Sequence, residues 1–166
     1  MSKSKVPVWL LDVHGVLNAD VPAWTGSPSV SYAFTDFEKY AMTWSPLLTE
    51  SICNLSQQGL VEVRWATTWI PWIEQIERIM NLGPFPVAFN LNPYNVRYAP
   101  VAKLDAALRV VEQENRLLIW TDDDAIPDRL KEPEAFLRLE GSLLIVPDSE
   151  TGLSPVHMEQ IESYCK

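Results

Sequence analysis

Near its N-terminus the chain reads Val8-Trp9-Leu10-Leu11-Asp12-Val13-His14-Gly15. The first four residues are apolar without interruption, which is typical of a short strand buried on both faces of a sheet. The run stops at an aspartate, and Gly15 permits a sharp turn directly after it. The pattern therefore predicts a strand of a parallel sheet, with Asp12 and His14 at its carboxyl end.

Strand patterns alternate with amphipathic helix patterns along the rest of the chain. Further strands are predicted at 60–67, 117–120 and 143–146, with a brief one at 86–89. Helices are predicted at 46–58, from Pro71 to about 82, at 101–114 and from Pro155 to the C-terminus. This alternation predicts a three-layer, Rossmann-like α/β fold whose mostly parallel sheet has about five strands and helices on both faces.

The length of 166 residues suits one domain spanning residues 1–166. Residues 18–44 and 84–100 have no clear periodicity, and we interpret them as loop insertions near the site. Both are too short for a large cap, so a minimal cap and an open cleft are expected.

Polar residues follow several of the predicted strands. They are Asp12 and His14, then Thr67 and Thr68, then Asp122, Asp123 and Asp124, with Lys103 at the start of the helix before the last strand. In open α/β sheets, ligands bind at the carboxyl ends of the strands. Carboxylates, hydroxyls and one ammonium at a single rim indicate a site for a phosphate and a metal ion.

Each of these groups suits one task in phosphoryl transfer. An aspartate such as Asp12 can attack phosphorus and form an aspartyl-phosphate. Magnesium prefers one or two carboxylates, which Asp12 together with Asp122 or Asp123 would supply, the choice within 122–124 staying open. Lys103 and Thr67 would hold the phosphoryl oxygens.

The residues around the turn complete the predicted site. Gly15 allows backbone amides to approach a phosphate, and Thr68 and Trp69 are further candidates for substrate binding. His14 lies where a general acid/base would act, and its ordinary pKa of about 6.5 suits that role. A cationic imidazole would, however, repel a bound magnesium ion.

The motifs in their order resemble the haloacid dehalogenase-like (HAD) superfamily. Leu10 to Asn18 looks like its first motif, Thr67 or Thr68 like the second, Lys103 like the third, and Asp122–Asp124 like the acidic fourth. The resemblance covers nearly the whole chain and is greatest to a small cap-less subgroup that includes domains associated with RNA repair. It implies Mg²⁺-dependent phosphomonoester hydrolysis through the first aspartate. The chain departs from the pattern at His14, where the family has a second aspartate as general acid/base.

Composition limits the partners. The formal net charge is −9, which argues against tight non-specific nucleic-acid binding, so the expected substrate is a phosphorylated small molecule or a nucleic-acid phosphate end. No apolar run is long enough for a transmembrane helix. Two isolated cysteines, Cys53 and Cys165, and a basic start (Met1 to Lys5) without a signal-peptide pattern favour the cytoplasm.

Two functions of different classes fit these observations. One is a Mg²⁺-dependent phosphatase, and the other is a catalytically silent HAD fold that binds a phosphorylated ligand or a protein. A phosphorelay receiver domain has its acidic pair before the threonine and lysine, an order opposite to this one. A P-loop NTPase and a zinc enzyme lack their motifs in this sequence.

Overall fold

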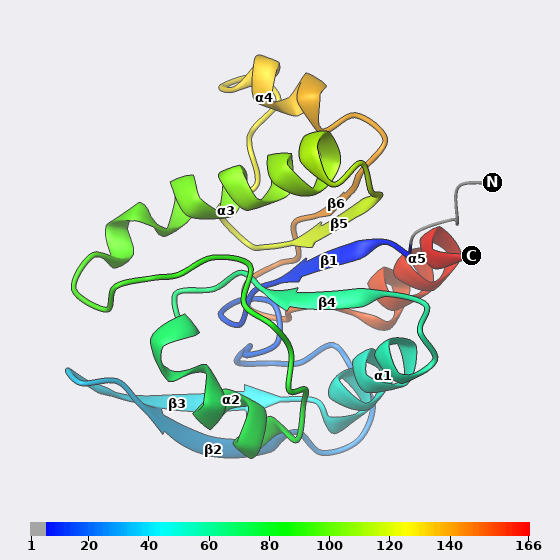
Figure 1. Ribbon diagram of the computed structural model, residues 1–166. Coiled ribbons are helices and arrows are strands. Elements are labelled where there is room, and N and C mark those ends of the chain that lie inside the picture. The colour runs from blue at the N-terminus through cyan, green and yellow to red at the C-terminus, as the bar shows by residue number, and fades with distance from the viewer. Residues whose placement is uncertain (1–5) are drawn as a thin grey trace.

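The computed structural model describes residues 6–166, so the basic segment 1–5 lies outside the described residues. Within 6–166 the main sheet contains four parallel strands in the order β4-β1-β5-β6 (Figure 1). Their bounds are β1 Val8–Leu11, β4 Glu62–Trp65, β5 Leu118–Thr121 and β6 Leu143–Ile145. The prediction of an α/β fold with a parallel sheet is confirmed.

Alternation of side chains along β1 divides the core between the two faces of the sheet. Trp9 and Leu11 belong to one hydrophobic cluster, while Val8 and Leu10 belong to a second. All four side chains are fully buried, as the uninterrupted apolar run predicts.

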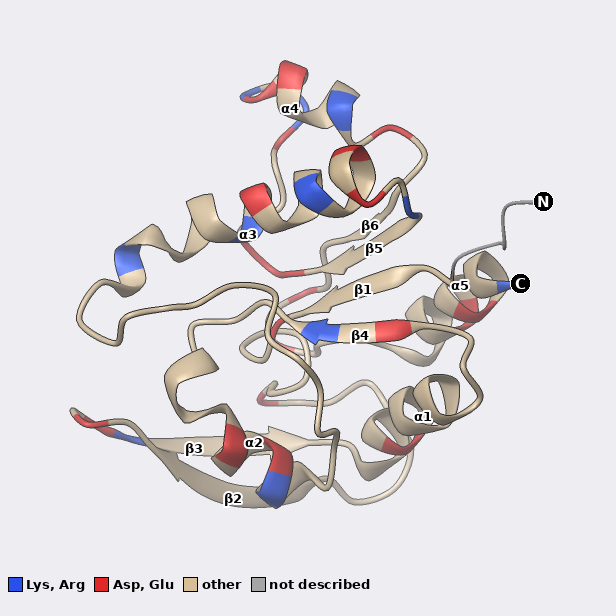
Figure 2. Ribbon diagram, viewed as in Figure 1, with Lys and Arg blue, Asp and Glu red and all other residues tan. Residues whose placement is uncertain are grey.

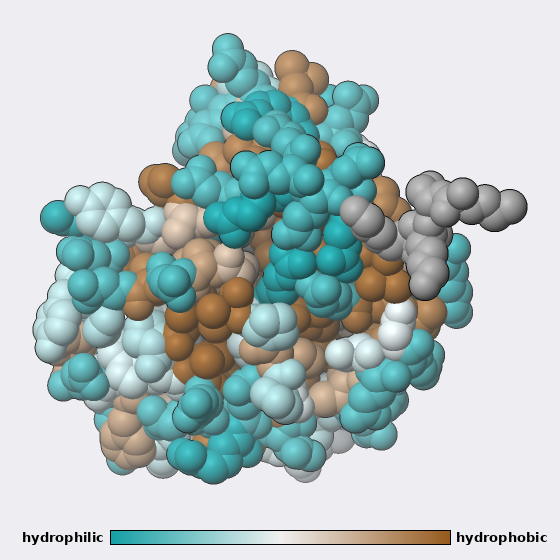
Figure 3. All heavy atoms as spheres, in the orientation of Figure 1, coloured by the Kyte–Doolittle hydropathy of each residue, from teal (hydrophilic) through white to brown (hydrophobic). Residues whose placement is uncertain are grey.

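Helices cover both faces (Figure 1). The first cluster includes buried residues of α1 (Pro46–Gln57), α2 (Ile73–Met80) and α5 (Pro155–Cys165), and the second includes those of α3 (Ala99–Leu108). Shorter helical segments are η1 (Ile70–Trp72), η2 (Val96–Tyr98), η3 (Arg109–Gln113) and α4 (Pro133–Arg138). Figure 3 shows hydrophilic residues over α3 and α4, with apolar surface in the middle of the same face, toward α2.

The predicted strand at 86–89 is reduced to a single parallel bridge between Val87 and Trp65. Trp65 N–H donates to Pro86 O, and Ala88 N–H donates to Trp65 O. Pro84 and Pro86 have no backbone N–H, so they cannot donate the hydrogen bonds that would extend the pairing with β4.

The segment 18–44 was expected to be irregular, and this is wrong for its second half. An antiparallel hairpin forms from β2 (Ser29–Phe34) and β3 (Lys39–Trp44). On β2 the small Ala33 faces the core, whereas Val30, Tyr32 and Phe34 are exposed. Because the large apolar residues of β2 point to solvent and a small residue points to the core, the usual strand pattern is absent from this part of the sequence.

No helix within residues 6–166 has the length and apolar character needed to cross a bilayer. Cys53 and Cys165 are both free thiols, as the sequence predicts.

Candidate active site at the carboxyl ends of the strands

The register of the sheet brings the predicted site residues to one edge. Leu11, the last residue of β1, pairs with Trp65 on one side and with Thr121 on the other. The residues that follow these three strands, including Asp12 and Asp122, therefore emerge at the same rim. Figure 2 shows acidic segments directly after the tips of β1 and β5.

Lys103 joins the two aspartates. Its Nζ donates to Asp12 Oδ2 at 3.0 Å and to Asp122 Oδ2 at 2.7 Å. All three side chains are buried, and Lys103 is held there by the first half of α3. The sequence predicts these three groups at one rim, and the structure adds that the ammonium bridges the two carboxylates, which leaves one more negative than positive charge.

The excess of negative charge acts on the ionisation of Asp12. Burial and then the neighbouring charge of Asp122 raise the pKa of Asp12 to about 7, although Lys103 and a hydrogen bond from Thr67 act in the opposite direction. Burial also works against Asp122, but Lys103 and two backbone amides hold the pKa of that carboxyl below its usual range. These charges therefore favour partial protonation of Asp12. A bound cation would lower the pKa of Asp12 and favour its carboxylate form.

The acidic cluster has the donor chemistry for a hard cation. One carboxylate oxygen from each of Asp12, Asp122, Asp123 and Asp124 lies within 4.8 Å of the others. Oxygen ligands of this kind suit Mg²⁺. The residues present therefore fit the metal ion that the sequence predicts.

The four carboxylates are not equally available to a cation. Asp122 Oδ2 accepts from Lys103, and its Oδ1 accepts from the backbone N–H groups of Asp124 and Ala125. Asp123 is half-buried, and its carboxylate lies against Gly15 so closely that a Cβ at Gly15 would overlap Asp123 Oδ2. Asp124 is exposed. Asp12 Oδ2 accepts from Lys103 and its Oδ1 accepts from Val13 N–H, so both of its oxygens are also engaged. Asp123 and Asp124 therefore have the more accessible oxygens, and Asp122 is committed to holding Lys103 and the turn.

His14 is engaged at both ring nitrogens. Trp69 Nε1–H donates to His14 Nε2 at 3.0 Å, and Asn18 Nδ2 lies 3.1 Å from His14 Nδ1. An indole nitrogen is only a donor, so this contact requires an unprotonated Nε2. Burial and the charge of Lys103 lower the pKa of His14, which also favours the neutral ring. In this arrangement the imidazole has no proton on Nε2 to give to a leaving group.

The two threonines take different positions. Thr67 is fully buried, forms a hydrogen bond that stabilises the Asp12 carboxylate, and accepts from Trp69 N–H at 3.2 Å. Thr68 is half-buried and lines a cavity beside the site together with Trp69. The preference for Thr67 over Thr68 as the residue next to Asp12 thus agrees with the geometry.

Sequence reasoning did not single out Asn18 or Tyr40 as part of the site. Asn18 Oδ1 accepts from Thr43 N–H at 2.8 Å, which ties the turn after β1 to the hairpin. The ring of Tyr40 lies 5.9 Å from His14 and 5.4 Å from Trp69, measured between centroids. For Asn18 the sequence offered a signal, because this residue ends the first motif. For Tyr40 it offered none, because the hairpin that carries it was not predicted.

No family model, curated protein or solved structure matches this chain.

Proposed function

We propose that this protein is a Mg²⁺-dependent phosphohydrolase of the HAD type, with Asp12 as nucleophile. The observation that carries the proposal is the buried Asp12–Lys103–Asp122 arrangement at the carboxyl ends of parallel strands. The order of motifs that resembles the HAD superfamily supports it, and so does the placement of helices on both faces of the sheet. Under this proposal the domain is HAD-like with a minimal cap, and it acts in the cytoplasm on a phosphorylated small molecule or a nucleic-acid phosphate end.

The proposed reaction has two steps. A carboxylate oxygen of Asp12 attacks phosphorus, and the ester oxygen leaves with the electrons of the P–O bond and takes a proton from a general acid. Water then attacks the phosphorus of the aspartyl-phosphate and gives its proton to the group that acted as general acid, which releases inorganic phosphate and restores both that acid and the Asp12 carboxylate. Lys103 and Thr67 already contact Asp12 and are placed to neutralise phosphoryl oxygens.

Asp12 and Asp123, with Asp122 or Asp124 in support, would hold the magnesium ion. When bound, the ion supplies charge neutralisation for the phosphoryl group. Asp122 also positions Lys103 beside the nucleophile, a role that its two occupied oxygens assign to it.

Replacing Gly15 by alanine is expected to weaken Mg²⁺ binding by about tenfold or more, because the new Cβ would displace Asp123. Gly59→Ala is the matched control. Gly59 has φ +70°, close to the +69° of Gly15, but open space where the Cβ would go. Both variants should lose about 1 kcal/mol of stability from the left-handed backbone. Isothermal titration calorimetry should show weaker Mg²⁺ binding in Gly15→Ala than in Gly59→Ala. Equal Mg²⁺ affinities in the two variants would contradict the assignment of Asp123 as a metal ligand.

A second candidate function rests on the contact between Trp69 and His14. Because His14 Nε2 accepts from the indole, that nitrogen has no proton for a leaving group, and the single proton of the neutral ring lies on Nδ1, toward Asn18. A HAD fold in this state would bind a phosphorylated ligand or a protein partner without turnover.

A hydrolysis screen distinguishes the two functions. Wild-type protein should release phosphate from at least one of an aryl phosphate, a sugar phosphate, a nucleotide and a 3′- or 5′-phosphorylated oligonucleotide with Mg²⁺ present. EDTA should abolish the release, and added Mg²⁺ should restore it. Absence of turnover across the panel with Mg²⁺, Mn²⁺ or Co²⁺ would favour the binding function.

A further inference from the structure

A cavity of about 220 Å³ opens beside the acidic site. His14, two residues after the nucleophile, forms part of its wall, as does Thr68, the neighbour of Thr67. The remaining walls come from the hairpin turn, from the Trp69–Trp72 segment and from the loop before η2. A ligand in this cavity would therefore contact residues that closely follow Asp12 and Thr67 in the chain.

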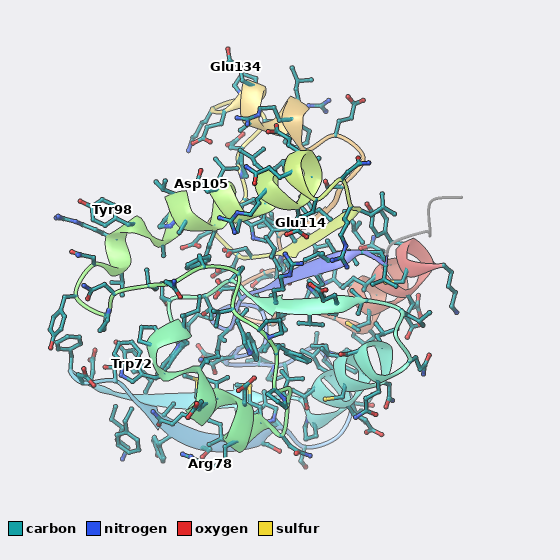
Figure 4. All side chains as sticks on the ribbon, in the orientation of Figure 1. Trp72, Arg78, Tyr98, Asp105, Glu114 and Glu134 are labelled. Carbon is teal, nitrogen blue, oxygen red and sulfur yellow. The ribbon has the colours of Figure 1, made fainter. Side chains whose placement is uncertain are left out.

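Aromatic rings dominate the walls. Trp69 contacts Tyr40 edge-on at 5.4 Å and Trp72 at 6.0 Å between ring centroids. Phe37 adds a fourth ring at the mouth, where it contacts Tyr94 at 5.6 Å, so the hairpin turn meets the 90–95 loop there. Figure 4 labels Trp72 at the turn that leads into α2. Planar groups are the natural occupants of such a cavity.

Polar contacts hold these rings in place. Trp72 Nε1–H donates to Asp36 Oδ1 at 3.2 Å, Tyr40 O–H donates to Glu38 Oε2 at 2.9 Å, and Trp69 donates to His14. Rings that are fixed before binding lose little entropy when a ligand enters.

The cavity also offers a hydroxyl group and an acidic border. Thr68 lines it and can hydrogen-bond to the polar edge of a heterocycle. The hydroxyl of Thr35 is committed to the hairpin turn, where it donates to Glu38 O and accepts from the Phe37 and Glu38 N–H groups. Asp36 and Glu38, in the hairpin turn, are exposed acidic residues at the same border. The exposed Lys39 follows them, so the turn has a net charge of −1 and no cluster of positive charge for additional phosphate groups, which favours a ligand with a single phosphate over a polyphosphate or a long polynucleotide.

We infer that this aromatic cavity binds the base of a nucleoside monophosphate whose phosphate lies at Asp12. The inference rests on the proposed function, because it assigns the substrate of the same site. Stacking on aromatic rings supplies binding without strict base selectivity, so several bases should be accepted.

The test compares two phenylalanines of the same hairpin. Phe37 lines the cavity and is 62% exposed, whereas Phe34 is 52% exposed and lies outside it, so neither replacement by alanine should disturb folding. Titration calorimetry would use adenosine 5′-monophosphate, phenyl phosphate and glucose 6-phosphate, each with the Asp12→Asn protein and Mg²⁺. The nucleotide should bind about tenfold more tightly than the sugar phosphate. Phe37→Ala should remove about tenfold of the nucleotide affinity, and Phe34→Ala should leave it unchanged.

The possible outcomes separate the inference from the proposed function. Equal affinity for nucleotide and sugar phosphate, or equal effects of the two alanine variants, would overturn the inference even if wild-type protein hydrolyses phosphate esters. Tighter binding of phenyl phosphate than of the nucleotide would overturn the choice of a nucleobase. Selective nucleotide binding that depends on Phe37, without turnover by the wild type, would support the cavity assignment and contradict the hydrolase.

Discussion

Asp12→Asn is expected to lower kcat for phosphate release by at least about 10⁴-fold, because the amide oxygen cannot form the aspartyl-phosphate. The change is nearly isosteric, so Lys103 keeps its contact with Asp122 at 2.7 Å. Measurement of phosphate release under saturating substrate and Mg²⁺ gives the ratio directly. Acid-quenched wild-type protein should also carry phosphate on Asp12, which mass spectrometry of the peptide would detect, and the variant should carry none.

Stability measurements show whether Asp12→Asn loses activity because the protein unfolds. Because burial and Asp122 raise the pKa of Asp12 to about 7, the folded protein binds that proton more tightly than the unfolded chain does. Stability contributed by protonated Asp12 is lost as the pH rises toward and through 7, and a neutral asparagine avoids that loss. The apo variant should therefore melt no lower than wild type at pH 8. Asp105→Asn, on the exposed side of α3 (Figure 4), is the matched control and should retain full activity. Residual turnover of Asp12→Asn near the wild-type rate would exclude Asp12 as the nucleophile.

Much of the site could be predicted because the polar residues directly follow buried strands. Continuous apolar runs at 8–11 and 117–120 mark the two strands, which form at Val8–Leu11 and Leu118–Thr121. In a parallel sheet the carboxyl ends of such strands lie at one edge, so the local sequence predicts Asp12 and Asp122 at the same rim, and the adjacency of β1 and β5 then makes them neighbours. Lys103 could not be assigned to the site from its local sequence, since its burial depends on how α3 packs on the sheet. Its position in the order of the motifs was the basis for predicting it.

The parts that could not be predicted depend on contacts between distant segments. The hairpin β2–β3 exposes Val30, Tyr32 and Phe34, so its alternation does not mark an inward face. Without the hairpin, nothing in the sequence places Tyr40 beside His14. The indole of Trp69 reaches His14 across 55 positions of the chain, and a contact of that kind has no local signature.

His14→Asp is expected to raise kcat by about 10²-fold, which is the lower end of what a positioned acid or base contributes. The imidazole accepts from Trp69 at Nε2 and faces an amide nitrogen of Asn18 at Nδ1, so its neighbours are arranged for an acceptor at both positions. A carboxylate is shorter than the imidazole, so its oxygens can accept from Asn18 at the Nδ1 position, while the contact of Trp69 with Nε2 is lost. Aspartate is also the residue type that the HAD pattern, which this sequence resembles, has two positions after the first aspartate.

His14→Asn is the matched control, because it has the shape of the aspartate without its capacity to exchange a proton. Asn at this position should show no gain, and melting temperatures of both variants with and without Mg²⁺ would show whether the fold and the metal site persist. If His14→Asn instead lost about 10²-fold and His14→Asp gained nothing, the histidine itself would be the acid/base in turnover, and its contact with Trp69 would have to break during the reaction. A gain confined to aspartate, with equal Mg²⁺ affinity in the two variants, would mean that the Asp12 site is complete and that proton transfer at position 14 limits the rate, because the added charge would then not act through the metal ion.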